Sequence, residues 1–355
     1  MENKSYPAPK QEYKVMVQCC TYNQSQYIED ALKGFAMQQT NFPFICCVFD
    51  DASTDGEQEV LKSWINSHCD LEHVEVYDHP LTMIHMAPDK NNSNCIYAIH
   101  LQKVNTWGKP EKLEMMLHWE KQCEYIALCE GDDYWIDPLK LQKQVDFLDA
   151  NPEYVLCHTG FKILEDSKSK FIDCTEIIQR NTKFYDNKKK IMEDILNGNH
   201  YRIQPMSTLM RLSAYLKVKA ILEPYEGKYL MGDTQTWLAL LSMGDVYFMP
   251  EITSVYRVHR GSACQQIDIK SRLRFDLSCA EMRIEMAELF NLNEECKKKL
   301  QKQYQKKLNL YYCYDYKYKP FVELKFANVI DTLQYYTLKT KPIRFLLKWA
   351  YEKFI

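Results

Sequence analysis

The first 70 residues alternate between two kinds of hydrophobic pattern. Two apolar runs, 13–20 and 44–49, predict buried strands. Each is followed by a segment, 27–37 and then 60–65, whose apolar residues recur at three- and four-residue spacing, which predicts helices. Strand, helix, strand, helix is the order of a mostly parallel sheet with crossover helices, so we expect an α/β fold with helices flanking the sheet.

The pattern is less regular beyond residue 78. The segment 78–120 is polar and rich in asparagine, and a helix is expected only over 111–122. A short apolar strand, 125–129, comes next. A helix from Asp137 to Leu148, with a proline in its first turn, and a strand over 154–158 should follow.

The rest of the chain suggests an appended helical region. Residues 161–200 are charged and poorly patterned, a helix is expected over 234–242, and everything past Ile267 is typical of helices. With 355 residues, 46% hydrophobic and 26% charged, the chain has the composition of a folded globular protein. We therefore expect three parts: a tail (1–12), an α/β domain (13–265) and a helical, basic C-terminal extension (266–355).

The fourteen cysteines do not indicate a disulfide framework or a zinc site. Two adjacent pairs, Cys19-Cys20 and Cys46-Cys47, lie in predicted strands, where neighbouring side chains point to opposite faces. No C-x-x-C pair occurs, so we expect free cysteines that pack as small core residues. Only 10 glycines are present, and neither a Walker motif nor a dinucleotide fingerprint is found.

Charge is distributed unevenly along the chain. Residues 296–355 hold 14 Lys or Arg against 4 Asp or Glu, while the whole chain has a net charge of −3. After Pro342, apolar and basic residues fall on different faces of an expected helix, which suits an anionic membrane surface. Helices packed on the α/β domain with solvated lysines are the alternative. No signal peptide or membrane span is recognised, so we expect a cytoplasmic protein, peripheral at the inner face of the membrane under the first interpretation.

Two acidic clusters directly follow apolar strands. They are Asp50-Asp51 and the group Glu130, Asp132 and Asp133. In open parallel sheets, ligands bind just beyond the carboxyl ends of the strands. Converging carboxylates repel one another unless a cation is present, and oxygen ligands select Mg²⁺ or Mn²⁺, which also bind substrate phosphates. A polar turn with a helix cap is the alternative interpretation of each cluster.

Five motifs in order resemble those of the family-2 glycosyltransferases. These are inverting enzymes with the GT-A fold, and the resemblance is closest to bacterial members that build surface polysaccharides. The motifs cover residues 13 to about 262. They are Thr21-Tyr22-Asn23, Asp50-Asp51-Ala52-Ser53-Thr54-Asp55, Glu130-Gly131-Asp132-Asp133-Tyr134-Trp135, Gly232-Asp233 and Tyr256-Arg257-Val258-His259.

The resemblance implies roles for individual residues in binding the nucleotide-sugar. Thr21 and Tyr22 would line the base pocket, and Asp51 would bind the base with Asp50 supporting the same loop. Glu130 stands where many relatives have a leading aspartate, and it would belong to the same nucleotide-sugar site. Trp135 and Trp237 could flank the sugar sites, although aromatic residues at such spacings are more often core residues.

The resemblance also implies a metal site and a base. Asp132 and Asp133 match the D-x-D-type ligands of metal and ribose, with His259 returning to the metal or diphosphate and Mn²⁺ or Mg²⁺ as cofactor. Asp233 matches the catalytic base, although Asp-Thr-Gln-Thr-Trp before an apolar helix would equally suit an N-cap. The expected partners are a nucleoside-diphosphate-sugar, with a UDP-sugar favoured, and a glycan or lipid-linked acceptor.

Other functions fit the sequence less well. A metal-dependent nucleotidyltransferase should have a glycine- and arginine-containing phosphate loop near the first strand, and 18–27 has none. An inactive relative that binds a glycan or a partner at a membrane is an alternative, but the candidate metal cluster and Asp233 are both intact. Nucleic-acid binding is not expected, since no recognised module is present. Residues 91–108 have no clear match to the family's acceptor loop, which leaves the donor sugar open.

Overall fold

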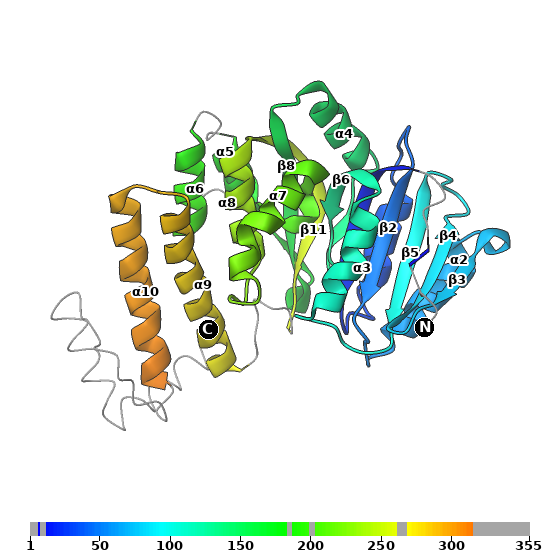
Figure 1. The fold of residues 1–355 in the computed structure, drawn as a ribbon, viewed down its shortest axis with the longest axis horizontal. Helices are drawn as coiled ribbons and strands as arrows, with labels where there is room; N and C mark the ends of the chain where they lie inside the picture. The colour runs from blue at the N-terminus through cyan, green and yellow to red at the C-terminus, as the bar shows by residue number, and fades with distance from the viewer. Residues whose placement is uncertain (1–5, 8–11, 183–186, 199–202, 261–267, 315–355) are drawn as a thin grey trace. The chain divides into compact units, whose positions relative to one another are not determined.

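A computed structural model describes the chain except for residues 1–5, 8–11, 183–186, 199–202, 261–267 and 315–355 (Figure 1). The chain divides into two compact units. The first contains the described residues up to Ile191, those of His200–Pro224, and Thr236–His259. The second contains the described residues of Met192–Asn199, Tyr225–Gln235 and from Arg260 onward. The amphipathic segment predicted after Pro342 lies outside the described residues.

The first unit is built on a large mixed sheet with a parallel centre. Four strands form this centre in the order β5, β2, β1, β6, and all three neighbouring pairs are parallel (Figure 1). Their bounds are β1 (Tyr13–Thr21), β2 (Phe44–Asp50), β5 (Cys95–Gln102) and β6 (Cys123–Leu128). This is the mostly parallel sheet that the opening strand–helix repeats predict.

Antiparallel strands extend the sheet on both sides of this centre. Beyond β5 lie β4 (Thr82–Pro88) and β3 (Glu75–Asp78), each antiparallel to its neighbour. Beyond β6, the order is β10, β8, β11 and β7, with β9 paired to β8. In this half only β8 and β11 pair in parallel. The bounds are β7 (Tyr134–Trp135), β8 (Tyr154–Glu165), β9 (Lys170–Ile172), β10 (Thr208–Arg211) and β11 (Asp245–Val258).

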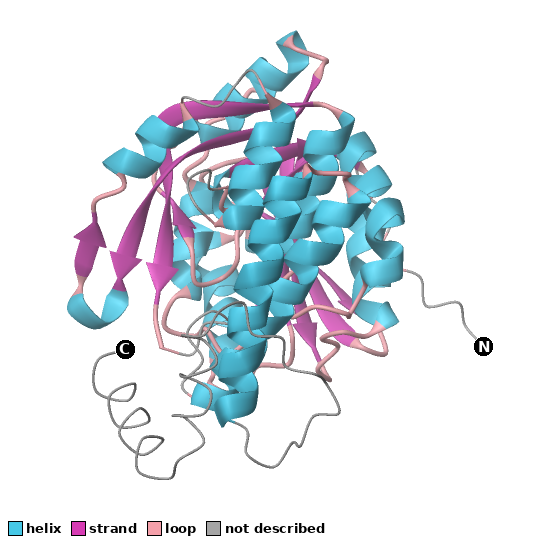
Figure 2. Cartoon of the chain, turned by 90° about the vertical axis from the view of Figure 1, so that its left-hand side faces the viewer, coloured by secondary structure: helices cyan, strands magenta, loops and turns pink. Residues whose placement is uncertain are grey.

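Helices cover the two faces of the central sheet (Figures 1 and 2). Strand β2 divides its side chains between them: Phe44, Cys46 and Val48 pack on one face, and Ile45, Cys47 and Phe49 on the other. The first face is covered by α1 (Ile28–Ala36), α2 (Glu57–His68) and α4 (Lys140–Ala150), and the second by α3 (Pro110–Glu120). Each large apolar side chain buried there stabilises the fold by about 1.5–3 kcal/mol.

The remaining helices complete the two units. They are α5 (Thr175–Asn181), α6 (Lys188–Asn197), α7 (Leu212–Leu222), α8 (Asp233–Met243), α9 (Ile269–Leu289) and α10 (Glu294–Tyr314). Short 3₁₀ turns span Leu71–His73, Asp166–Lys168, Pro205–Ser207 and Glu223–Tyr225. In the second unit α9 packs against α10. No helix within the described ranges combines the length and the apolar character needed to span a membrane.

The predicted α/β class is confirmed, with local differences. The strands predicted over 13–20, 44–49 and 125–129 are present, but β4 and β5 lie in the segment 78–120, for which only a helix was predicted, and β3 lies directly before them. The helix predicted from Asp137 begins at Lys140 instead. The twelve cysteines for which the structure gives a state are free, and all but Cys20 are buried, as expected of small core residues.

Candidate active site

The acidic clusters of the sequence lie at one edge of the central sheet. Because β2, β1 and β6 are parallel neighbours, their carboxyl ends point to the same edge. Thr21, the last residue of β1, pairs with Asp50, the last residue of β2. Cys129 donates its backbone N–H to the Gln18 carbonyl at 3.1 Å, which brings the 130–133 loop against the end of β1.

Glu57 joins the two loops that follow β1 and β2. It is fully buried at the start of α2 and accepts hydrogen bonds from the Thr21 hydroxyl, from the Gln24 backbone N–H at 2.8 Å and from the Ser53 hydroxyl at 2.8 Å. Burial raises the pKa of the Glu57 carboxyl, while these three donors oppose the shift. Nothing in the sequence indicates this role for Glu57, because a glutamate in the first turn of a helix is ordinarily a solvated charge.

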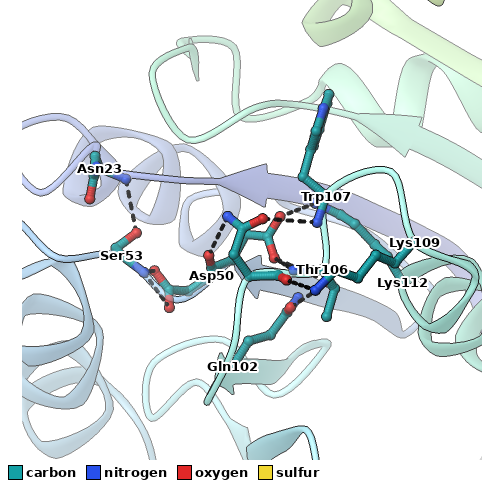
Figure 3. Close-up of polar contacts among 10 residues, drawn as sticks. Asn23, Asp50, Ser53, Gln102, Thr106, Trp107, Lys109 and Lys112 are labelled. Atoms are coloured by element: carbon teal, nitrogen blue, oxygen red, sulfur yellow. Dashed lines mark hydrogen bonds and ion pairs between the residues drawn. The ribbon is translucent and has the colours of Figure 1, made fainter. Parts of the chain in front are cut away.

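Asp50 and its neighbours form a second bridge between the loops (Figure 3). The Asn23 backbone N–H donates to Ser53 Oγ at 2.8 Å, and the Ser53 N–H donates to Asp50 Oδ1 at 3.3 Å. Gln58 donates its side-chain amide to Asp50 and to the Gln102 carbonyl. Burial raises the pKa of the Asp50 carboxyl. Asp50 therefore lies in a hydrogen-bond network that joins the loops after β1 and β2.

Asp51 holds the segment that follows β5. Its Oδ1 accepts from the Thr106 backbone N–H at 2.6 Å and from the Thr106 hydroxyl at 3.1 Å, and its Oδ2 lies 3.2 Å from Lys112 Nζ (Figure 3). Both Asp51 and Lys112 are buried. The carboxylate that was predicted to bind the base thus has three donors from this protein already. The Lys112 contact was not foreseen, since lysines are seldom buried.

An exposed indole stands over the same segment. Trp107 is 74% exposed, and Lys112 Nζ lies 4.8 Å from the centre of its ring. In Figure 3 the ring projects away from the hydrogen-bonded network around Asp50. Tyr22, predicted to lie near the base, is 48% exposed at the end of β1. Two aromatic faces are therefore open to solvent on loops that follow parallel strands.

Gly131 lets the acidic loop approach β1 closely. A methyl group at this position would lie 2.4 Å from Thr21 Oγ1 and 2.6 Å from Gln24 Oε1, both far inside contact distance. Its backbone N–H donates to the Cys20 carbonyl at 3.2 Å. A glycine here is thus a packing requirement that places Asp132 and Asp133 beside the β1 loop.

Asp132 and Asp133 both contact the end of β11. Asp132 Oδ2 lies 2.9 Å from His259 Nε2, and both side chains are largely buried. Asp133 Oδ1 accepts the Arg257 backbone N–H at 2.8 Å. Burial, and secondly the nearby charge of Asp132, raise the pKa of the Asp133 carboxyl well above its usual range. Asp132, Asp133 and His259, the three residues predicted as metal ligands, therefore lie close together in the fold.

Arg257 links these acidic residues to α1 and to two tyrosines. Its guanidinium donates to Asp30 Oδ2 at 2.8 Å and lies 4.5 Å from the ring of Tyr27 and 5.2 Å from that of Tyr134. The Tyr27 ring in turn lies 4.7 Å from the His259 ring. Helix α1 and strand β11 thereby fix the histidine, and the sequence alone gave no signal for this use of the arginine.

The acidic pair suits a metal bound jointly with substrate. Within the described residues, no three His, Cys, Asp or Glu side chains are placed to hold an ion by themselves. Mg²⁺ and Mn²⁺ at phosphate sites commonly take one or two carboxylates and complete their shell with phosphate oxygens and water. Burial, and secondly the charge of Asp132, raise the pKa of the Asp133 carboxyl, and a nearby cation would stabilise its ionised form. The residues therefore fit such an ion.

The structure places the remaining candidates, Asp233, Glu130, Trp135 and Trp237, as follows. Asp233 begins α8 and belongs to the second unit. Its side chain keeps solvent access, yet desolvation by surrounding chain raises the pKa of its carboxyl to about 6. Glu130 is exposed. Trp135 and Trp237 are 2% and 3% exposed, which agrees with the interpretation that they are core residues.

Part of this chain matches a known family model, and a longer part is similar to two mycobacterial proteins. Residues 17–86 match the family model described as Glycosyl transferase family 2. The chain is 28% identical over 246 residues to the uncharacterized proteins Rv1520 of Mycobacterium tuberculosis and Mb1547 of Mycobacterium bovis. The alignment covers 67% of this chain and 57% of each relative, so the chain spans little more than half the length of those proteins.

Two solved structures are also similar. One is S. aureus TarS 1–349 in complex with UDP-GlcNAc, at 15% identity and a TM-score of 0.47, covering 85% of this chain and 73% of that one. The other is the mannosyltransferase PcManGT from Pyrobaculum calidifontis in complex with GDP-Man and Mn²⁺, at 14% identity and a TM-score of 0.48, covering 96% and 85%. The match to the model of Glycosyl transferase family 2 covers residues 17–86, which carry β1, β2 and the loops of Thr21, Asp50 and Asp51, and this is the family that the motifs resemble.

Proposed function

We propose that this protein is a metal-dependent, inverting glycosyltransferase. It would move a sugar from a nucleoside-diphosphate-sugar, with a UDP-sugar favoured, to a hydroxyl of a glycan or lipid-linked acceptor in surface polysaccharide biosynthesis. The observation that carries the proposal is the pairing of Asp132 with His259, beside Asp133, at the carboxyl edge of a parallel sheet. Ligands of open α/β sheets bind at this edge.

In this proposal, separate groups of residues bind the metal and the nucleoside. Asp132 and Asp133 would hold Mn²⁺ or Mg²⁺, with His259 orienting Asp132 or adding a nitrogen ligand. Such an ion would offset the negative charge that develops on the departing diphosphate. Thr21, Tyr22 and the loop built on Asp50 and Asp51 would bind the nucleoside.

Asp233 would act as the base. Its carboxylate would take the proton of the acceptor hydroxyl while that oxygen bonds to the anomeric carbon and the bond to the diphosphate breaks. One displacement without a covalent intermediate inverts the anomeric configuration. A pKa of about 6 leaves the carboxylate ionised at neutral pH and makes it a stronger base than an ordinary aspartate.

The proposal includes where in the cell the enzyme acts. The enzyme would work in the cytoplasm, at the inner face of the membrane if residues 296–355 bind anionic lipid. Deleting that segment should then reduce partitioning into the membrane fraction. Unchanged partitioning would favour helices that pack on the protein instead.

A donor screen tests the activity. The full chain is incubated with UDP-, GDP-, CMP- and dTDP-linked sugars and Mn²⁺, and release of free nucleotide and binding of each donor are measured. We expect turnover with at least one nucleoside-diphosphate-sugar, abolished by EDTA and by Asp233→Asn. The matched control is Glu153→Gln, an exposed acid at the far end of β8. If no donor is bound or turned over, the proposal is wrong, and full activity in Asp233→Asn would refute the base alone.

A further inference from the structure

A groove lies at the opposite edge of the central sheet from the candidate active site. It is formed by the chain between α1 and β2, the turn before β5 and the start of α4. Its volume of about 540 Å³ falls within the roughly 300–1,000 Å³ of small-molecule sites. Strand β2 runs from this edge to Asp50 over seven residues, so about 20 Å separates the two edges at ~3.3 Å per residue.

The lining is unusual in composition. No lining residue is charged, and Ala36 and Met37 are the apolar ones. Six side chains of the lining are carboxamides: Gln38, Gln39, Asn41, Asn91, Asn92 and Gln142. A carboxamide offers donors and an acceptor together. This matches a sugar hydroxyl, which also donates and accepts, whereas a phosphate or a metal ion would need charged partners.

The floor of the groove is held rigidly by part of this set. The Gln38 side chain donates to the Gly34 carbonyl at 3.1 Å and to the Asp137 carbonyl at 2.9 Å, and it accepts from the Leu141 N–H at 3.1 Å. The Asn92 amide donates to the Ala36 carbonyl at 3.0 Å and to the Gln38 carbonyl at 2.7 Å. Three separate segments of the chain are thereby locked together before any ligand arrives.

The rim of the groove is free to bind. Gln39, Asn41 and Asn91 are exposed, and within the described part of the chain their side-chain amides make no hydrogen bond. The Asn41 backbone is fixed, since its N–H donates to Gln142 Oε1 at 2.8 Å. Met37, 37% exposed, adds an apolar face of the kind against which the C–H side of a sugar ring packs. Fixed floor, free carboxamides and one apolar face together favour a neutral saccharide over a drug-like apolar ligand.

We propose that this groove binds a neutral oligosaccharide, and that it holds the acceptor glycan at a second site away from the transfer centre. The saccharide site stands on its own observations, while its use as an acceptor anchor rests on the proposed function. Holding a chain of several sugars at a second point raises the effective concentration of its free end near the transfer centre.

The test measures saccharide binding directly. The labelled full chain is applied to an array of neutral oligosaccharides of hexoses and N-acetylhexosamines. We expect binding to at least one group of these glycans, reduced about tenfold or more in Gln39→Ala/Asn41→Ala, as the loss of several hydrogen bonds predicts. Gln301→Ala, an exposed amide on α10, is the matched control and should bind normally. Absence of binding, or binding that the double variant leaves unchanged, would overturn the proposal.

Nucleotide-sugar binding separates this proposal from the function. In the same preparations, the double variant should keep donor binding, and Asp132→Asn should lose it while still binding glycan. Glycan binding through the groove without any donor binding would support the saccharide site and contradict the glycosyltransferase. Donor turnover without glycan binding would support the glycosyltransferase and contradict the saccharide site.

Discussion

Asp132 Oδ2 and His259 Nε2 lie 2.9 Å apart, although 127 positions separate them along the chain. The contact joins the loop after β6 to the end of β11, on opposite sides of β10 and β8 in the sheet. A histidine beside an acidic residue can orient that carboxylate or share a cation with it. The pair therefore tests whether this edge of the sheet is a metal site.

Replacing either partner should impair metal-dependent turnover to different degrees. His259→Ala should weaken the apparent affinity for Mn²⁺ and the turnover by about 10–100-fold, as for residues that orient a ligand. Asp132→Asn should cost more, because it removes a carboxylate oxygen charge from the site itself. Turnover is followed against Mn²⁺ concentration, with Glu153→Gln as the unaffected control. An unchanged Mn²⁺ dependence in His259→Ala would exclude the histidine from the site.

Glu57 should matter for stability as well as for the nucleotide loops. In Glu57→Gln, the NH₂ cannot replace Oε2, because the Gln24 backbone N–H there can only donate. An NH₂ in place of Oε1 forces the Thr21 hydroxyl to turn its proton to Gln24 Oε1, 2.9 Å away, and all three donors lose a charged acceptor. We expect a loss of about 1–3 kcal/mol in the free energy of unfolding, measured by urea titration.

Glu59→Gln is the control for this change. It alters an exposed glutamate of the same helix that makes only a 3.8 Å ion pair with Lys62, so its effect should stay within about 0.5 kcal/mol. Equal effects of the two variants would show that the buried hydrogen bonds of Glu57 contribute nothing.

The buried pair of Asp51 and Lys112 predicts a non-additive double variant. Lys112→Met leaves a buried carboxylate without its cation and should cost about 3–5 kcal/mol, less whatever the two Thr106 donors retain. Adding Asp51→Asn should recover part of this loss, because the uncompensated charge disappears. Lys109→Met, on an exposed lysine directly before α3, is the control. Strictly additive losses in urea unfolding would contradict the coupling.

The sequence was informative where each residue's environment follows from its own strand. Phe44 to Phe49 alternate between the two faces of the sheet, and the acids at the ends of β2 and β6 lie at its carboxyl edge. Strand β5 was missed although it lies beside β2, and seven of its eight residues are buried, among them the polar His100 and Gln102. A strand buried on both faces lacks the two-residue alternation of apolar and polar positions by which a half-buried strand is recognised.

Residues buried by partners from distant segments could not be predicted. Glu57 and Lys112 are charged, and such residues are ordinarily solvated. Their burial depends on hydrogen bonds with Thr21 and Asp51, from other elements of the fold. Arg257 was noticed only as part of a motif, because its contacts with Asp30 and Tyr27 bring together the start of α1 and the end of β11, which are more than 200 residues apart in the sequence.

His100 makes the stability of the fold depend on pH. It is fully buried in β5, where its Nε2 accepts the Trp119 indole N–H at 2.8 Å. Burial lowers the pKa of His100 to about 3, whereas an unfolded histidine has a pKa of about 6.5. Below pH 6.5 the unfolded chain therefore binds a proton that the folded chain does not. The effect of His100 on the free energy of unfolding is therefore constant above about pH 6.5. Below that pH, the free energy of unfolding falls by about 1.4 kcal/mol for each pH unit.

Comparison with His100→Gln isolates this effect. His158, whose pKa is also lowered to about 3 by burial, acts in the same direction, whereas the raised pKa values of buried acids such as Asp133 act in the opposite one. The difference between proteins is therefore the useful quantity. Between pH 7.5 and 5.5, the wild type should lose about 1.4 kcal/mol more unfolding free energy than His100→Gln. His73→Gln, which removes an exposed histidine, should follow the wild type. Identical pH dependence in wild type and His100→Gln would mean that His100 gains its proton in the folded protein as readily as in the unfolded chain.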